Sequence, residues 1–193
     1  MRSAKKFMLS GAILIALFAA CAKPPVEDMD NAAAAVSKAE NDPDVIAYSQ
    51  SDLTKARESL DDMRTEADAK RYDEAKRLAQ EVIAIAERAI QNGRNAAVRT
   101  RDEAAAALIA MEAALSETTQ TIENARTAKQ RGIDFEEIDR DLMDARAAAD
   151  DARNANSDKR YRDAINASSA TRNKLSSITA KIGQVSIAAS RKK

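Results

Sequence analysis

The sequence predicts an all-α protein: an elongated, coiled-coil-like helical bundle built from two copies of a three-helix unit. Three observations carry this prediction. The 193 residues include only 4 Gly, 3 Pro and 3 % aromatics, which leaves few turn or strand formers. Apolar residues recur three and four positions apart, as on one face of a helix. The sequence also repeats itself at a spacing of 89 residues.

The repeat aligns residues 52–75 with residues 141–164 without a gap, and 11 of these 24 positions are identical. Its best-kept stretch is Lys70-Arg71-Tyr72-x-x-Ala75, which returns as Lys159-Arg160-Tyr161-x-x-Ala164. A chance match of this density is rare, so we interpret the alignment as an internal duplication.

In copy one, the first Ala-rich helix should end at Asn41-Asp42-Pro43, because proline disfavours helix in the residue before it. A second helix follows, with Ser49-x-x-Asp52 as a weak capping box, and a turn falls near Lys70-Arg71. The predicted seam of the second and third helices comprises Leu53, Ala56, Leu60, Met63 and Ala67, then Ala75, Leu78, Val82, Ile85 and Ala89.

In copy two, Arg131-Gly132 should end the first helix, and Asp134-x-x-Glu137 should form a capping box for the second. Between Tyr72 and Gln130, Gly93 is the only helix breaker, so one long central helix shared by both copies is expected. The predicted seam of the last two helices comprises Ile138, Leu142, Ala145, Ala149 and Ala152, then Leu175, Ile178, Ile182 and Val185. Charges at i,i+4 opposite the seams, such as Arg57–Asp61 and Arg77–Glu81, indicate a solvated face.

Residues 1–20 have the pattern of a secretory signal. Three basic residues precede an apolar run of 14 residues, 7–20, that ends in small side chains. A helix of that length spans about 21 Å, which is too short for a bilayer core of about 30 Å.

Cys21, the only cysteine, follows this signal. Leu17-Phe18-Ala19-Ala20-Cys21 resembles the lipobox of bacterial lipoproteins, although Phe18 departs from the usual aliphatic residue. The resemblance implies a lipid on the Cys21 thiol, and Ala22, in place of Asp, implies the outer membrane. Two alternatives stay open: cleavage after Ala22, which would leave no anchor, and a buried free thiol.

These features divide the chain into a signal peptide, a tether, two helical repeats and a basic tail, with the ranges 1–20, 21–28, 29–95, 96–186 and 187–193. Removing residues 1–20 removes three basic residues and no acid. The mature chain then has 28 basic and 31 acidic residues, a net charge of −3. This balance argues against a nucleic-acid-binding role.

The repeat resembles an uncharacterised family of bacterial envelope lipoproteins, known only as a domain of unknown function. Tyr72-Asp73-Glu74-Ala75 leading to Leu78-Ala79 fits the family pattern well, whereas Tyr161-Arg162-Asp163-Ala164 leads to the poorer Ala167-Ser168. The resemblance covers most of residues 29–92 and, more weakly, residues 118–182.

No constellation of catalytic residues is visible. Without His, and with one Cys, the chain lacks the groups of most nucleophile systems, so we expect neither an enzyme nor a cofactor. The repeated carboxylate pairs Asp61-Asp62 and Asp150-Asp151 predict solvation and no metal site, because adjacent helical residues point about 100° apart.

The expected function is a periplasm-facing, outer-membrane-anchored spacer or scaffold with an unidentified envelope partner and scope for self-association. One alternative is a helical binding module in which Tyr72 and Tyr161 line a groove for a peptide or lipid, rather than packing between helices. A second alternative follows from the terminal Lys193, which resembles that of the murein lipoprotein and implies a covalent link to peptidoglycan.

Overall fold

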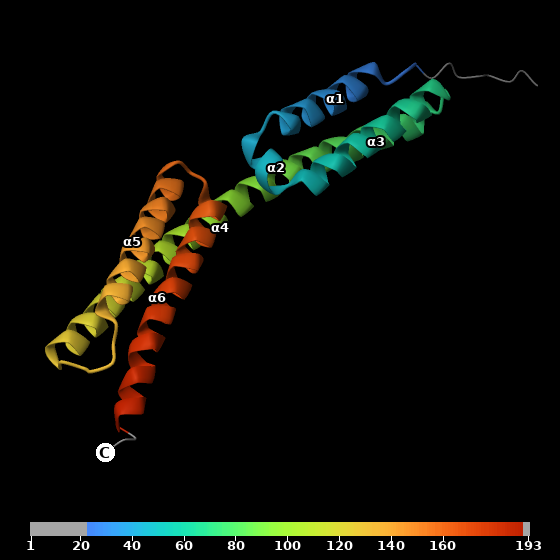
Figure 1. Ribbon diagram of the computed structural model, residues 1–193. Helices are drawn as coiled ribbons and strands as arrows, with labels where there is room; N and C mark the ends of the chain where they lie inside the picture. The colour runs from blue at the N-terminus through green and yellow to red at the C-terminus, as the bar shows by residue number, and fades with distance from the viewer. Residues whose placement is uncertain (1–22, 191–193) are drawn as a thin grey trace, which may run out of the picture.

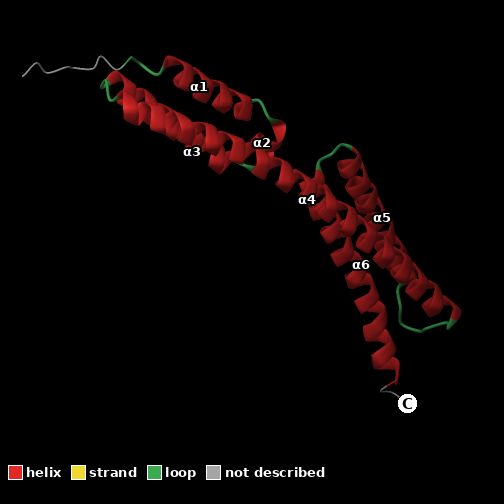
Figure 2. Ribbon diagram, turned by 180° about the vertical axis from the view of Figure 1, so that it is seen from behind, coloured by secondary structure: helices red, strands yellow, loops and turns green. Residues whose placement is uncertain are grey.

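The computed structural model describes residues 23–190, with side chains up to residue 185. In this part of the chain every regular element is a helix, which confirms the all-α prediction (Figure 2). The helices are α1 (Val26–Glu40), α2 (Pro43–Tyr48), α3 (Gln50–Asp68), α4 (Tyr72–Thr127), α5 (Phe135–Ser157) and α6 (Tyr161–Ser190).

Two helical units lie one after the other along α4, and the first has one helix more than the predicted three because it includes α2 (Figure 1). We call α1, α2 and α3 with the first half of α4 the first unit, and the second half of α4 with α5 and α6 the second unit. The long helices reverse direction at each turn (Figure 1). Because α4 is continuous and packs against α1 and α3 and then against α6, it is both the last helix of the first unit and the first helix of the second. The shared central helix is therefore confirmed, although it ends at Thr127 and not at Gln130. Its 56 residues correspond to about 84 Å.

The short helix α2 was not predicted. Asp42 begins it by accepting hydrogen bonds at Oδ1 from the backbone N–H groups of Asp44 (2.9 Å) and Val45 (3.3 Å). Ser49 then separates α2 from α3, and its hydroxyl donates to Asp52 Oδ2 at 3.0 Å instead of capping the backbone. The capping box predicted for Ser49 and Asp52 is therefore wrong, because the two side chains bond to each other.

The core of the first unit is a thin seam of small and aliphatic side chains. Seven of the ten predicted seam positions of α3 and α4 are buried, whereas Ala67, Leu78 and Ile85 are half-buried. Alanine supplies much of this seam, so the helix axes approach closely and each helix buries only a narrow stripe. The buried residues are Ala32, Val36, Ala39, Val45, Leu53, Ala56, Leu60, Met63, Ala75, Ala79, Val82, Ala86, Ala89 and Ile90.

The second unit buries more polar groups. Its predicted seam is confirmed at all five positions of α5 and at Leu175, Ile178 and Ile182 of α6, whereas Val185 is only half-buried. Beside this seam, Thr118 of α4 faces Thr179 of α6 with their hydroxyl oxygens 3.4 Å apart. Asp134 caps α5 as predicted, accepting from the N–H groups of Glu136 and Glu137. The Glu137 carboxylate pairs with Lys181 of α6 instead of closing the capping box.

Charged side chains along the rims of the seams form ion pairs both within helices and between neighbouring helices. Arg77 pairs with Glu81 at 2.9 Å, as the i,i+4 spacing predicts. Arg57 instead reaches from α3 to Glu40 of α1 at 2.7 Å, which corrects the predicted pairing with Asp61. Exposed pairs of this kind contribute about 0.2–1 kcal/mol each.

Three predicted boundaries fall inside helices, and the one between residues 95 and 96 lies in the shared helix α4. Helix α1 begins at Val26, directly after Pro24-Pro25, and so includes part of the range 21–28 expected to be a tether. Helix α6 continues to Ser190, beyond the limit of 186 expected for the second repeat.

Gly93 explains how α2 fits against the long helix. A Cβ at this position would lie 2.9 Å from the backbone carbonyl of Asp44 and from the backbone N of Val45. Since α4 continues through Gly93 without a break, this glycine acts as a contact surface for the α2 backbone and not as a helix breaker.

We expect Gly93→Ala to destabilise the protein by about 1–3 kcal/mol, although alanine favours helix, because the methyl group meets backbone that cannot move aside. Gly183→Ala is the matched control. It also lies in a long helix, but its Cβ would meet nothing within 4 Å, so it should stabilise by about 0.5–1 kcal/mol. Urea unfolding followed by circular dichroism measures both, and equal effects would contradict the close approach of α2.

Candidate functional site

The largest groove that the structure shows between the two units lies where α2, the middle of α4 and the start of α6 meet. We call it the junction groove. It has a volume of about 520 Å³. Tyr48 and Tyr161 bring aromatic rings, Val98 brings an exposed apolar side chain, and Arg101 and Lys159 bring positive charge. Pro43, Asp44, Ala47 and Ala97 complete the lining.

The chemistry of the junction groove is aromatic and cationic. The Arg162 guanidinium carbon lies 4.6 Å from the centre of the Tyr48 ring, which is a cation–π contact between the two units. Arg101 pairs with its neighbour Asp102 at 3.0 Å. The arrangement can receive an apolar group that carries a negative charge beside it.

The two tyrosines predicted as interaction residues have different surroundings. Tyr161 is half-buried, lines the junction groove and packs against the small cluster of Ala104, Ala155 and Ala164. Tyr72 is half-buried at the start of α4, at the far end of the first unit (Figure 1). About 25 residues of α4, or roughly 40 Å, separate Tyr72 from the junction groove. The structure therefore does not bring them into one groove.

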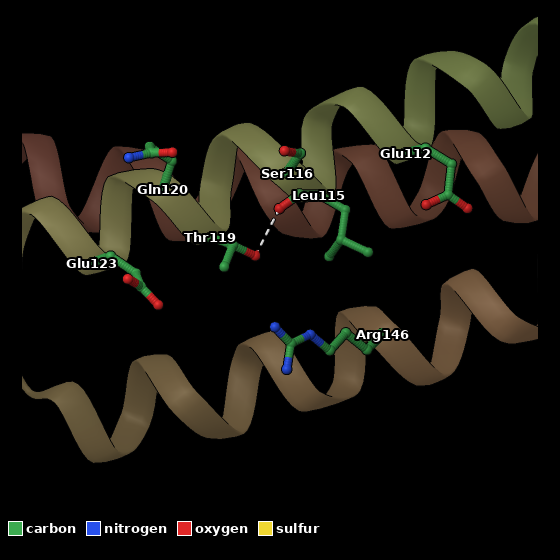
Figure 3. Close-up of a pocket in the computed structure, with 7 residues that line it drawn as sticks. All are labelled: Glu112, Leu115, Ser116, Thr119, Gln120, Glu123 and Arg146. Carbon is green, nitrogen blue, oxygen red and sulfur yellow. Dashed lines mark hydrogen bonds between the residues drawn. The ribbon is translucent and has the colours of Figure 1, made fainter.

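A second groove, of about 360 Å³, separates α4 from α5 in the second unit (Figure 3). Two ion pairs join α4 to α5 on either side of it along the helices: Arg126 with Asp139 at 2.6 Å, and Arg153 with Glu112 at 2.7 Å. Between these pairs the Arg146 side chain extends from α5 toward α4, where Leu115, Ser116, Thr119, Gln120 and Glu123 line the opposite wall.

Ion pairing distinguishes Arg146 from two other cations of the second unit, Arg153 of α5 and Lys181 of α6. The hydrogen bond to Glu112, with a smaller effect from Asp150, raises the pKa of Arg153. Lys181, held between Asp141 and Glu137, likewise has a raised pKa. Arg146, in contrast, makes no ion pair within the described chain. The groove therefore holds a guanidinium, that of Arg146, that makes no ion pair with the described residues.

The repeated basic pairs terminate helices. Lys70 and Lys159 adopt left-handed backbone conformations, with φ of 59° and 60°. The residue after each lysine donates its backbone N–H to the carbonyl oxygen five residues earlier. Arg71 donates to Glu66, and Arg160 donates to Ala155. This is the Schellman pattern of a helix end. Lys129, with φ of 47°, ends α4 in the same way.

The first aspartate of each repeated acidic pair makes an ion pair on the surface. Asp61 pairs with Arg64, and Asp150 pairs with Arg153, each three residues apart on one helix. Within residues 23–190, no cluster of three or more candidate ligands is placed to hold a metal ion. No helix of the described chain is both long enough and apolar enough to cross a membrane.

Cys21 and Lys193, the candidate lipidation and peptidoglycan-linkage sites, lie outside the described residues.

Comparison with protein families gives one match. The family model described as a domain of unknown function (DUF4398) matches residues 27–107. A DUF4398 domain thus spans the first unit and the part of α4 that passes the junction groove. No curated protein and no solved structure matches the chain.

Of the two tyrosines that line the junction groove, the sequence pattern singled out Tyr161 but not Tyr48. Tyr161 was found because it recurs in the repeat. Tyr48 lies in the unpredicted helix α2 and has no counterpart that would single it out. Arg146 was missed as a groove residue because it lies four residues before Asp150, a spacing typical of a surface ion pair, whereas Asp150 pairs with Arg153 in the structure.

We expect Lys159→Gly to stabilise the protein by about 0.5–1 kcal/mol, because glycine adopts the left-handed conformation without a steric penalty. Lys174→Gly is the control: it removes the same charge from α6, inside a regular helix, and should destabilise by about 1 kcal/mol. Thermal unfolding measures both. A loss of stability in Lys159→Gly as large as in Lys174→Gly would contradict a conformational role for this lysine.

Proposed function

We propose that this protein is a lipid-anchored spacer of the bacterial cell envelope, fixed in the outer membrane through Cys21 and extending into the periplasm. The observation that carries the proposal is the unbroken helix α4, which is about 84 Å long and is shared by both units. A compact chain of this size would have a radius of gyration of only about 16 Å.

The packing around α4 favours a rod that keeps its length. Helices α1 and α3 cover its first half, α6 covers its second half, and α2 crosses it at Gly93. Isolated helices fray easily, whereas neighbouring helices packed along both halves of α4 keep it helical from end to end.

The positions of the chain ends also fit a rod that stands on a membrane. The described chain begins at Lys23, two residues after Cys21, and leads into α1 at the outer end of the first unit (Figure 1). Helix α6 ends at Ser190 at the other end of the molecule. A lipid on Cys21 would therefore hold one end of the rod and leave the other end free.

The same arrangement favours the alternative that the distal end is linked to peptidoglycan. Lys193 follows Ser190, the last residue of α6, by three residues in the sequence. The binding-module alternative rests on a different observation, the aromatic and cationic lining of the junction groove.

We further propose that the two units arose by duplication. The left-handed lysines Lys70 and Lys159 and the ion pairs Asp61–Arg64 and Asp150–Arg153 recur at the repeat spacing. Adding a second unit through a shared helix lengthens the molecule without a flexible joint.

The experiment is reconstitution of the full-length, lipid-modified protein in a supported bilayer, with the thickness of the protein layer measured by neutron reflectometry. We expect a layer of at least about 80 Å, set by α4. A layer of about 40 Å or less, the thickness of a compact domain or of a rod lying flat, would contradict the spacer.

Cys21→Ser is the control for the anchor. It should incorporate no labelled palmitate and leave the bilayer bare, because a chain without acyl groups lacks the buried hydrocarbon that holds it. Equal palmitate labelling of the wild type and the Cys21→Ser variant would contradict lipidation at Cys21. It would not affect the conclusion drawn from the thickness of the protein layer.

A further inference from the structure

An exposed apolar stripe lies on α4 at the junction of the two units. The side chains of Val98 and Ile109 are 49 % and 72 % exposed. They are 11 residues apart, close to three helical turns, so they share one face of α4. Ala105 lies between them on the same face, and the buried Ala104 and Met111 lie on the other side of the helix. The stripe therefore belongs to neither core.

Charge is strongly segregated on either side of this stripe. Residues 88–101 contain four arginines and no acid, and residues 102–123 contain five acids and no basic residue. The residues are Arg88, Arg94, Arg99 and Arg101, then Asp102, Glu103, Glu112, Glu117 and Glu123. Ordinary solvated helices mix the two signs, so this segregation is not explained by the helix itself.

Part of this charge has no partner in the fold. Arg88, Arg99, Glu103 and Glu117 make no ion pair within the described chain, whereas Arg94 and Glu112 pair with Asp42 and Arg153. Arg88 and Glu117 lie on the same flank of the apolar stripe, because they are 29 residues apart, about eight helical turns. They are available to a neighbouring molecule.

We propose that the middle of α4 binds a second copy of this chain in an antiparallel arrangement, with the two-fold axis between Val98 and Ile109. Each Val98 then faces Ile109 of the second copy, and each Arg88 lies beside Glu117 of the second copy. A parallel pair would instead place arginines against arginines and acids against acids.

A second copy fits this surface better than another protein does, because the surface is complementary to itself. A symmetric two-fold interface requires each patch to match its own reverse. A basic segment and an acidic segment on either side of an apolar centre meet that requirement. The apolar area is small, so the dimer is weak in dilute solution and gains from the high local concentration of anchored chains.

The first test is thiol crosslinking of full-length chains in membranes with a short bismaleimide. Two differently tagged copies are coexpressed, one with V98C and the other with I109C. We expect at least a fivefold stronger crosslink between the tags than in the matched V98C/V98C and I109C/I109C pairs. V26C in both copies is the control, since Val26 is exposed and apolar but lies at the outer end of the first unit.

Three outcomes would overturn the proposal. They are a stronger crosslink in a matched pair, which indicates a parallel dimer; a V98C/I109C crosslink no stronger than the V26C control; and crosslinking only to a different protein. None of these outcomes depends on the spacer function, because the proposed dimer leaves the length of α4 unchanged.

The second test exchanges charges and measures the mass of the full-length protein in detergent by sedimentation equilibrium. R88E should raise the apparent dissociation constant at least tenfold, and the double variant R88E/E117R should restore most of the loss. Because both residues are exposed and make no ion pair in the described chain, circular dichroism should show an unchanged fold. Failure of the double variant to recover dimerisation while its fold is intact would overturn the antiparallel register.

Discussion

One stripe of small side chains along α4 holds both halves of this molecule. Positions seven residues apart on this helix are buried in turn, first as Ala75, Val82 and Ala89, then as Ala104, Met111, Thr118 and Ala125. The same side of α4 therefore supports α1 and α3 in the first unit and α6 in the second. An apolar stripe along a helix is stable only when other helices bury it. The flanking helices therefore lie one after another along α4 and do not gather into one compact bundle.

Alanine has a second consequence for this architecture. Small side chains allow close helix packing, but each one buries little apolar area. Since burial stabilises the fold by roughly 25 cal/mol per Å² of apolar surface, each alanine contributes little stability. The protein therefore combines narrow seams with cross-helix ion pairs such as Arg57–Glu40 and Arg153–Glu112. A molecule built in this way has a large surface for its size, and its functional features are shallow grooves and exposed stripes along the rod.

The sequence predicted the helices well because their signals are local. Heptad spacing, the Asp134 cap and the turns after Lys70 and Lys159 all depend on residues within one or two turns of each other. The sequence could not predict α2 or the role of Gly93, because both depend on the backbone of one helix meeting another helix. The junction groove has the same origin: Tyr48, Val98 and Tyr161 come together only when the two units are in place. The DUF4398 match to residues 27–107 covers the part of the chain where the resemblance was clearest.

The continuity of α4 can be measured directly as a distance between spin labels on exposed positions in each half of the helix. Gln80→Cys and Gln120→Cys, in a Cys21→Ser background diluted with unlabelled protein, lie 40 residues apart on either side of Gly93. A continuous helix predicts a single narrow distribution centred at about 60 Å by double electron–electron resonance. A broad distribution, or one centred well below about 50 Å, would show that α4 bends or breaks between the units and would contradict the shared rod.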